Sequence, residues 1–222
     1  TLPKTNTAWQ PVQLQGDNLM SNVPWGDTLD LDKSEDTFRI YGLNPNGFRL
    51  DKKGGDVTEC FMMADSIKAH FVGCSEHNLD FTQFRVQDTA YNAIRRTVEH
   101  SKAVWSTTPT TFDNMYKPGG TMSCVIGDGV ARVKESGSDD LGRWTYIKLA
   151  GKDNRILTII TVYQVCNKPT TAVNRDKCTA QAQQRSLLAQ RNKKDPSPIK
   201  HFRKDLDRFL KGCKTKNELI LL

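Results

Sequence analysis

The sequence predicts an α/β fold in which a mixed, mostly antiparallel sheet carries helices on one face. Three observations in the 222-residue chain support this prediction. A short apolar segment at 71–75 lies between two stretches with helical spacing of apolar residues. Residues 102–162 hold short β-rich segments separated by Gly, Asp and Asn, as in an antiparallel meander. The runs 155–162 and 219–222 are nearly continuously apolar, which is typical of strands covered on both faces.

The amino-terminal region divides at about residue 37. Residues 1–36 mix Pro, Asn, Gly and Asp with few periodic apolar positions, so we expect a flexible leader or linker. Residues 37–43 alternate in the manner of a strand. The following NPNG at 44–47 is a turn by composition, because Pro fixes one φ angle and Asn-Gly tolerates positive φ.

Two helices and a strand are expected next. The first helix covers 58–69, with Thr58 as its candidate N-cap. A buried strand at 71–75 ends at Glu76, and the second helix covers 83–99. The apolar side of the first helix is expected to hold Phe61, Met62 and Ile67.

The rest of the chain is predicted to be a run of strands, two helices and a last strand. The five strands are 102–106, 120–126, 131–135, 143–149 and 155–162. Helices near 176–191 and 198–212 precede a strand at 217–222. One face of such a sheet lacks a covering layer, so residues 37–222 are predicted to be an incomplete domain that is unstable alone.

Positive charge is concentrated in the carboxyl-terminal quarter. The chain carries a net charge of +7. Residues 168–222 hold 14 Lys/Arg and 5 Asp/Glu, a net charge of +9, so residues 1–167 carry a net negative charge. A basic segment of this kind is expected of proteins that bind polyphosphates, although lysines also simply solvate helix faces. The lysines and arginines that we expect to contact such a polyphosphate backbone are Lys193, Lys194, Lys200, Arg203 and Lys204.

Membrane and secreted classes are not indicated. No apolar stretch reaches the roughly 18 residues of a membrane span, and no secretory leader is visible, so an intracellular protein is expected. The six cysteines include no CxxC pair and are expected to be reduced and mostly buried. Cys74 and His77 form a lone CxxH, which is weak support for zinc.

Polar residues follow three of the predicted strands directly. Asn44 and Asn46 follow 37–43, Glu76 follows 71–75, and Tyr163 follows 155–162. Neighbouring strands of a sheet bring their ends together, and such ends are where sites are built. A carboxylate with amides beside it suits Mg²⁺, and a nearby Tyr hydroxyl can donate to a phosphoryl oxygen. Each signal alone is also explained by turn formation, solvation or packing.

The order and spacing of four motifs resemble the endonuclease/exonuclease/phosphatase superfamily. The motifs are IYGLNPNG at 40–47, SEHNLD at 75–80, PGGT at 118–121, and LGRWTY at 141–146 with IITVY at 159–163. Their wording is most similar to the endonuclease domain encoded with reverse transcriptase in non-LTR retrotransposons, and the likeness spans about 37–222. The resemblance implies the amino-terminal part of a four-layer, DNase I-like α/β sandwich.

The resemblance also implies roles for matching positions. Glu76 would ligate Mg²⁺ or Mn²⁺, and Asn46 would lie beside the ion. Asn44 would help to hold the scissile phosphate or the metal-site network. Tyr163 would hydrogen-bond the phosphate in the transition state. The partners implied are DNA and a reverse transcriptase domain later in the parent polyprotein, with action in the nucleus of a eukaryote.

The chain departs from the family pattern in ways that predict inactivity. Ser75 stands where a Gln commonly precedes the motif Glu, and the family's Gly-Asp-Phe-Asn motif would follow a strand like 218–222, where this chain stops. The Asp and His groups that supply the general base are also absent, which costs about 10²–10⁴ in rate or more. His77 is near the site in sequence, but proximity alone is weak support for a catalytic role.

Two alternatives remain open at the sequence level. A phosphomonoesterase or inositol-phosphate phosphatase on the same scaffold would share the metal and Tyr positions. A non-catalytic nucleic-acid-binding remnant would bind DNA with a steep salt dependence and no metal requirement.

Overall fold

A computed structural model describes residues 37–109, 117–166 and 179–222. The chain divides into two compact units, Thr1–Thr37 and Phe38–Leu222, and the described helices and strands belong to the second. The predicted leader at 1–36 and the first residues of the predicted helix at 176–191 lie outside the described residues.

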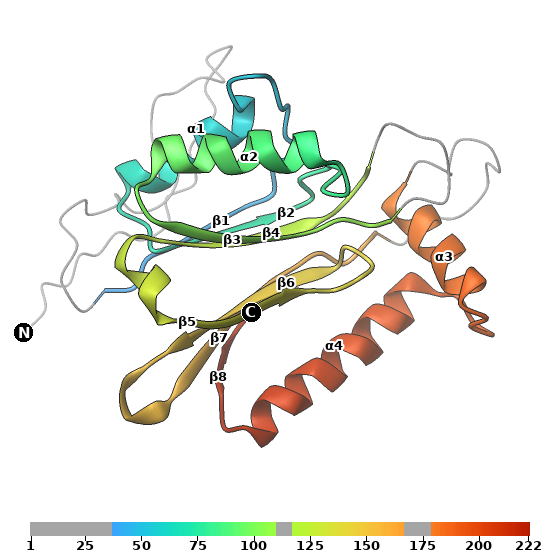
Figure 1. Ribbon diagram of the computed structural model, residues 1–222. Helices are drawn as coiled ribbons and strands as arrows, with labels where there is room; N and C mark the ends of the chain where they lie inside the picture. Colours follow the sequence, from blue (N-terminus) through green and yellow to red (C-terminus); the bar gives the residue numbers. More distant parts are fainter. Residues whose placement is uncertain (1–36, 110–116, 167–178) are drawn as a thin grey trace, which may run out of the picture. The chain divides into compact units, whose positions relative to one another are not determined.

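The described residues contain eight strands, which form two four-stranded sheets (Figure 1). The first sheet has the order β1-β2-β4-β3, and β1 is parallel to β2 while the other pairs are antiparallel. The second sheet has the order β5-β6-β7-β8, with β7 parallel to β8. Both sheets are therefore mixed and mostly antiparallel, as predicted. The strands are β1 Ile40–Leu43, β2 Phe71–Ser75, β3 Ser101–Ser106, β4 Thr121–Ile126, β5 Val133–Ser138, β6 Trp144–Ala150, β7 Ile156–Val162 and β8 Leu219–Leu221.

Each sheet carries helices on its outer face, and the two inner faces pack together (Figure 1). Helices α1 (Gly55–Ser66) and α2 (Phe84–Thr97) share a core with the first sheet. Helix α4 (Pro198–Thr215) packs on β6 through Phe202 and Leu206. Helix α3 (Ala180–Gln190) contacts α4. The α/β layered fold class is confirmed.

The prediction that one sheet face stays uncovered is wrong. Between the sheets, Phe71 and Val125 of the first pack against Ile147, Leu149 and Ile159 of the second, and all five are buried. The sequence pattern suggested one continuous meander, but the short 3₁₀ segment Gly127–Arg132 carries the chain from β4 into the other sheet.

Helix α1 starts earlier than predicted, and of its predicted apolar side Phe61 is buried and Ile67 packs against the core, while Met62 is exposed. Gly54, at φ 100°, is its N-cap, and Thr58 lies inside the helix with its hydroxyl donating to Lys53 O at 3.1 Å. Val57 and Phe61 are buried, whereas Met62 is 59% exposed. A helix turns about 100° per residue, so a neighbour of Phe61 leaves the buried stripe.

Helix α3 begins at a side-chain cap. The Thr179 hydroxyl accepts a hydrogen bond from the Ala182 N–H at 3.1 Å, which satisfies one of the free donors of the first turn. Among the described residues, none of the helices is long and apolar enough to cross a membrane.

Candidate functional site

The carboxyl ends of β1, β2 and β7 meet at one rim of the two sheets. β1 and β2 are parallel, with Leu43 opposite Cys74, so the residues that follow them emerge together. β7 of the second sheet comes close to β2 because residue 73 is glycine. A Cβ on Gly73 would lie 2.7 Å from Thr161 Oγ1, nearer than side chains normally approach. Any larger residue at position 73 would push the sheets apart at this rim.

Glu76 is the centre of the rim, and two neutral side chains hold its carboxylate. The Tyr163 hydroxyl donates to Oε1 at 3.1 Å. The Asn44 amide donates to Oε2, also at 3.1 Å. Three residues that the sequence predicts as site residues are thus in direct contact, although they come from three different strand ends.

Asn46 contacts Asn44 through its backbone. Its N–H donates to the Asn44 side-chain oxygen at 2.9 Å, which fixes the amide of Asn44 with its nitrogen toward Glu76. The side chain of Asn46 is exposed and makes no hydrogen bond within the part of the chain that the structure describes. The Asn46 side chain therefore lies next to the rim, where its amide oxygen is available as a ligand.

Left-handed backbone conformations cluster at the rim. Glu76 has φ 63°, Asn46 has φ 51° and Asn78 has φ 55°. This conformation is uncommon for residues other than glycine, most of all for a Glu. It costs about 1–3 kcal/mol and persists only where the surrounding structure imposes it. These three lie at the candidate site, whereas the other described residues with positive φ that are not glycine, Lys68, Asp153, Asn154, Asn192 and Asn217, lie elsewhere.

Hydrogen bonds from the neighbouring loops impose this backbone. The Glu76 N–H donates to Gly120 O at 2.7 Å, and the Gly47 N–H donates to Glu76 O at 2.8 Å. Asn78 adds a third tie, since its side-chain oxygen accepts from the Gly119 N–H at 2.6 Å. Asn78, Gly119 and Gly120 belong to the sequence motifs, but the sequence did not predict that they support Glu76. The adjacent glycines were the one hint of this role, because both adopt positive φ, which glycine tolerates best.

His77 is a core residue. It is fully buried beside the aromatic rings of Phe81 and Trp105. Its Nδ1 accepts from the Leu79 N–H at 3.0 Å, so the ring proton is on Nε2, which lies 3.0 Å from Ser106 O. Burial lowers the pKa of His77 to about 4, so the ring is neutral at pH 7. The structure gives no support to a catalytic role for His77.

A cation at this rim would meet oxygen ligands only. Within 37–109, 117–166 and 179–222, no group of three or more His, Cys, Asp or Glu side chains is placed to hold a metal. Both ring nitrogens of His77 already have backbone partners, Ser106 O and the Leu79 N–H, so the Cys74–His77 pair gains no support as a zinc site. Glu76 takes part in none of the ion pairs between described residues. A half-buried carboxylate held only by neutral donors fits Mg²⁺, which accepts one or two carboxylates and keeps several waters.

The five predicted DNA-contacting residues do not share one environment. Lys193 and Lys204 line a pocket of about 540 Å³ together with Arg143, and the other three do not line it. Lys200 pairs with Asp195 at 2.7 Å, which raises the pKa of the lysine. Lys194 and Arg203 are exposed.

Comparisons with known proteins give similarity to solved structures only. No family model matches the chain, and no curated protein matches it. An endonuclease/exonuclease/phosphatase family protein from Leptotrichia buccalis C-1013-b is 10% identical with a TM-score of 0.42, over 69% of this chain and 63% of its own. An AP endonuclease from Archaeoglobus fulgidus is 14% identical with a TM-score of 0.38, over 57% of this chain and 41% of its own.

A humanized TDP2 from D. rerio is also similar, at 12% identity and a TM-score of 0.33, over 59% of this chain and 49% of its own. The chain thus spans less than two thirds of the length of each of these structures. Since none of the three exceeds 14% identity, the chemistry of the rim rests on the residues of this chain.

Proposed function

We propose that the rim of Asn44, Asn46, Glu76 and Tyr163 is the metal- and phosphate-binding part of a metal-dependent DNA endonuclease. The observation that carries the proposal is the contact of Tyr163 and Asn44 with the two oxygens of Glu76. The sequences of the motifs favour the endonuclease of a non-LTR retrotransposon. Such an endonuclease would be followed by a reverse transcriptase domain in the parent polyprotein and would act in the nucleus of a eukaryotic host.

Glu76 and Asn46 would hold the cation, Mg²⁺ or Mn²⁺. Glu76 offers a carboxylate that neutral groups hold, and Asn46 offers an exposed amide beside it. The ion, when bound, would neutralise charge on the phosphate and on the leaving 3′ oxygen. All the ligands provided by the chain are oxygen atoms, the type that these hard cations prefer.

Tyr163 and Asn44 would bind the phosphate. The Tyr163 hydroxyl already donates into the rim, and a small rotation would direct it to a non-bridging oxygen of a phosphodiester. Asn44 has its amide nitrogen toward the same space. Donors that are in place before the reaction stabilise the developing charge without reorganisation, which is commonly worth about 10²–10³ in rate for one donor.

We further propose that this 222-residue chain is inactive by itself. The four rim residues include a single carboxylate, that of Glu76, and the nearby His77 is neutral and buried. The rim residues and His77 then offer no group to activate the attacking water, and lack of such a group costs about 10²–10⁴ in rate. Activity would require residues outside the rim.

Mn²⁺ binding tests the metal site in the chain as it is. Loss of the free Mn²⁺ signal in electron paramagnetic resonance measures affinity, and Glu76→Gln should weaken it at least about tenfold, since the charge of the ligand is removed. Glu99→Gln is the matched control, because Glu99 is exposed and lies just before β3, at the opposite end of the sheet from the rim. Equal Mn²⁺ affinity of wild type, Glu76→Gln and Glu99→Gln would contradict the proposed metal site.

Nicking of supercoiled plasmid tests the reaction. The proposed parent polyprotein should nick with Mg²⁺, and Glu76→Gln should slow it at least about 10²-fold. Undiminished nicking by the variant would contradict the assignment. Faster release of phosphate from small monoesters than nicking would favour a phosphatase instead.

A further inference from the structure

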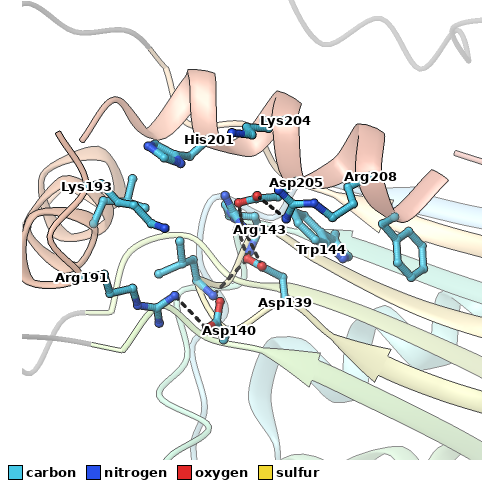
Figure 2. A pocket seen from close by; sticks show the side chains of 13 residues that line it. Asp139, Asp140, Arg143, Trp144, Arg191, Lys193, His201, Lys204, Asp205 and Arg208 are labelled. Carbon is cyan, nitrogen blue, oxygen red and sulfur yellow. Dashed lines mark hydrogen bonds and ion pairs between the residues drawn. The ribbon is translucent and has the colours of Figure 1, made fainter. Parts of the chain in front are cut away.

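We propose that the pocket lined by Arg143, Lys193 and Lys204 binds an uncleaved backbone phosphate of the nucleic-acid strand that crosses the Glu76 rim. The proposal deepens the proposed function and rests on it. The pocket, called here the basic pocket, has a volume of about 540 Å³. It lies between the turn before β6, the carboxyl-terminal end of α3 and one side of α4 (Figure 2).

The walls of the basic pocket carry more positive than negative charge. Five Lys or Arg and three Asp line it. The aspartates are already paired: Asp139 and Asp205 with Arg143, and Asp140 with Arg191. No carboxylate of the described chain lies within ion-pair distance of Lys193 or Lys204. Two uncompensated ammonium groups thus line the pocket from different segments, an arrangement that attracts a phosphate.

Arg143 supplies a buried donor at the base of the pocket. Its side chain is 3% exposed, and Nε and Nη2 bind Asp139 at 2.7 and 2.8 Å. Nη2 also donates to Asp205 at 3.0 Å. The remaining nitrogen, Nη1, is buried and has no hydrogen-bond partner among the described residues. A buried donor without a partner is costly, so an acceptor that reached Nη1 from the pocket, such as a phosphate oxygen, would be bound favourably.

The geometry of the strand ends links the basic pocket to the rim. The Tyr163 N–H donates to Arg143 O at 2.7 Å, so the backbones of the two residues are adjacent. Tyr163 directs its side chain to Glu76, whereas Arg143 directs its side chain to Asp139 and Asp205 beneath α4 (Figure 2). Because the two backbones are adjacent, a strand whose scissile phosphate is at Tyr163 is proposed to reach the basic pocket with a neighbouring phosphate. Phosphate contacts of this kind set affinity and register without reading sequence.

Fluorescence anisotropy of a labelled DNA duplex without added metal tests the proposal on the whole chain. The double variant Lys193→Gln/Lys204→Gln changes two exposed side chains that make no ion pair with the described residues, so the fold is retained. We expect the dissociation constant to rise at least about tenfold. The slope of log affinity against log salt should fall by about 0.9 for each phosphate that is no longer neutralised. Lys193→Arg/Lys204→Arg should restore binding.

A matched control removes the same charge elsewhere. Lys134→Gln/Lys152→Gln changes two exposed lysines at the opposite end of the second sheet, near the start of β5 and beyond the end of β6. Equal weakening by both double variants would overturn the proposal, because binding would then follow net charge alone. If the pocket variant no longer binds inorganic phosphate or a mononucleotide but binds the duplex as before, the nucleic-acid assignment is overturned.

The two proposals fail separately. The anisotropy assay contains no metal, so it does not depend on Glu76. Weakened DNA binding by the pocket variant, together with unchanged Mn²⁺ affinity of Glu76→Gln, would support the basic pocket and contradict the metal site. Unchanged DNA binding by the pocket variant, together with weakened Mn²⁺ affinity of Glu76→Gln, would support the metal site and contradict the basic pocket.

Discussion

The hydroxyl of Tyr163 donates to Oε1 of Glu76 at 3.1 Å, although 87 residues separate them in the chain. One residue follows a strand of the first sheet and the other follows a strand of the second. This hydrogen bond therefore joins the two sheets at the rim. It also places a donor and a carboxylate where the backbone is strained.

Tyr163→Phe should reduce catalysis far more than stability. Removing one hydrogen bond to a half-buried carboxylate costs about 1 kcal/mol of unfolding free energy. Removing a donor to the phosphate should slow plasmid nicking by the proposed parent polyprotein about 10²–10³-fold. Denaturant unfolding and nicking rates measure the two effects.

The chain contains a matched pair for this test. The Tyr146 hydroxyl donates to Glu135 Oε1 at 2.8 Å, so Tyr146→Phe removes the same kind of bond from a strand interior. It should cost similar stability and leave nicking unchanged. A slowing by Tyr146→Phe as large as that by Tyr163→Phe would mean that the effect is structural.

Glycine should be better tolerated than alanine at position 76. Both remove the carboxylate, but only glycine adopts φ 63° without a steric cost. Glu76→Gly should therefore be more stable than Glu76→Ala by about 1 kcal/mol in urea denaturation. At Glu59, inside α1, Glu59→Ala should instead be more stable than Glu59→Gly by about 1 kcal/mol, because glycine is the poorer helix former. The same order at both positions would contradict the left-handed backbone at Glu76.

The elements and the rim could be predicted because their signals are local. Alternation, apolar runs and turn residues mark each strand, and β2 was predicted with its observed ends, 71 and 75. Parallel pairing of β1 with β2 then brings Asn44 to Glu76 without further information. Tyr163 followed from the motif order, although it follows a strand of the other sheet.

The local sequence pattern predicts neither the basic pocket nor the division into two sheets, which was implied only by the resemblance to a four-layer sandwich. A glycine turn such as Gly127-Asp128-Gly129 leads equally well to a hairpin or to a change of sheet, and the choice depends on packing of Phe71 and Val125. The partners of Arg143 lie 4 and 62 residues away, and no local pattern marks the second. Long-range side-chain pairs of this kind follow only from the fold.

His77 should make the protein less stable as pH falls from about 6.5 to about 4. The unfolded chain binds a proton on this ring below pH 6.5, whereas the folded chain does so only near its lowered pKa of about 4. The stability present above pH 6.5 is thus lost in that window, by about 3 kcal/mol at most. Urea denaturation of wild type and His77→Gln measures the difference in slope. Titration of the His77 ring resonance with a midpoint near 6.5 would contradict the lowered pKa.

Asp139→Asn should destabilise the fold much more than Asp140→Asn, although the two residues are adjacent. Asp139 and Arg143 form an ion pair at 2.7 Å with side chains 5% and 3% exposed. Removing one charge from a buried pair leaves the other uncompensated, which costs about 3–5 kcal/mol, and Asp205 offsets only part of this. Asp140 pairs with Arg191 at 2.8 Å, but the two side chains are 66% and 42% exposed, so its removal should cost under about 1 kcal/mol. Thermal or urea unfolding distinguishes the two cases, and equal effects would mean that Arg143 is accessible to water and is not a buried donor of the basic pocket.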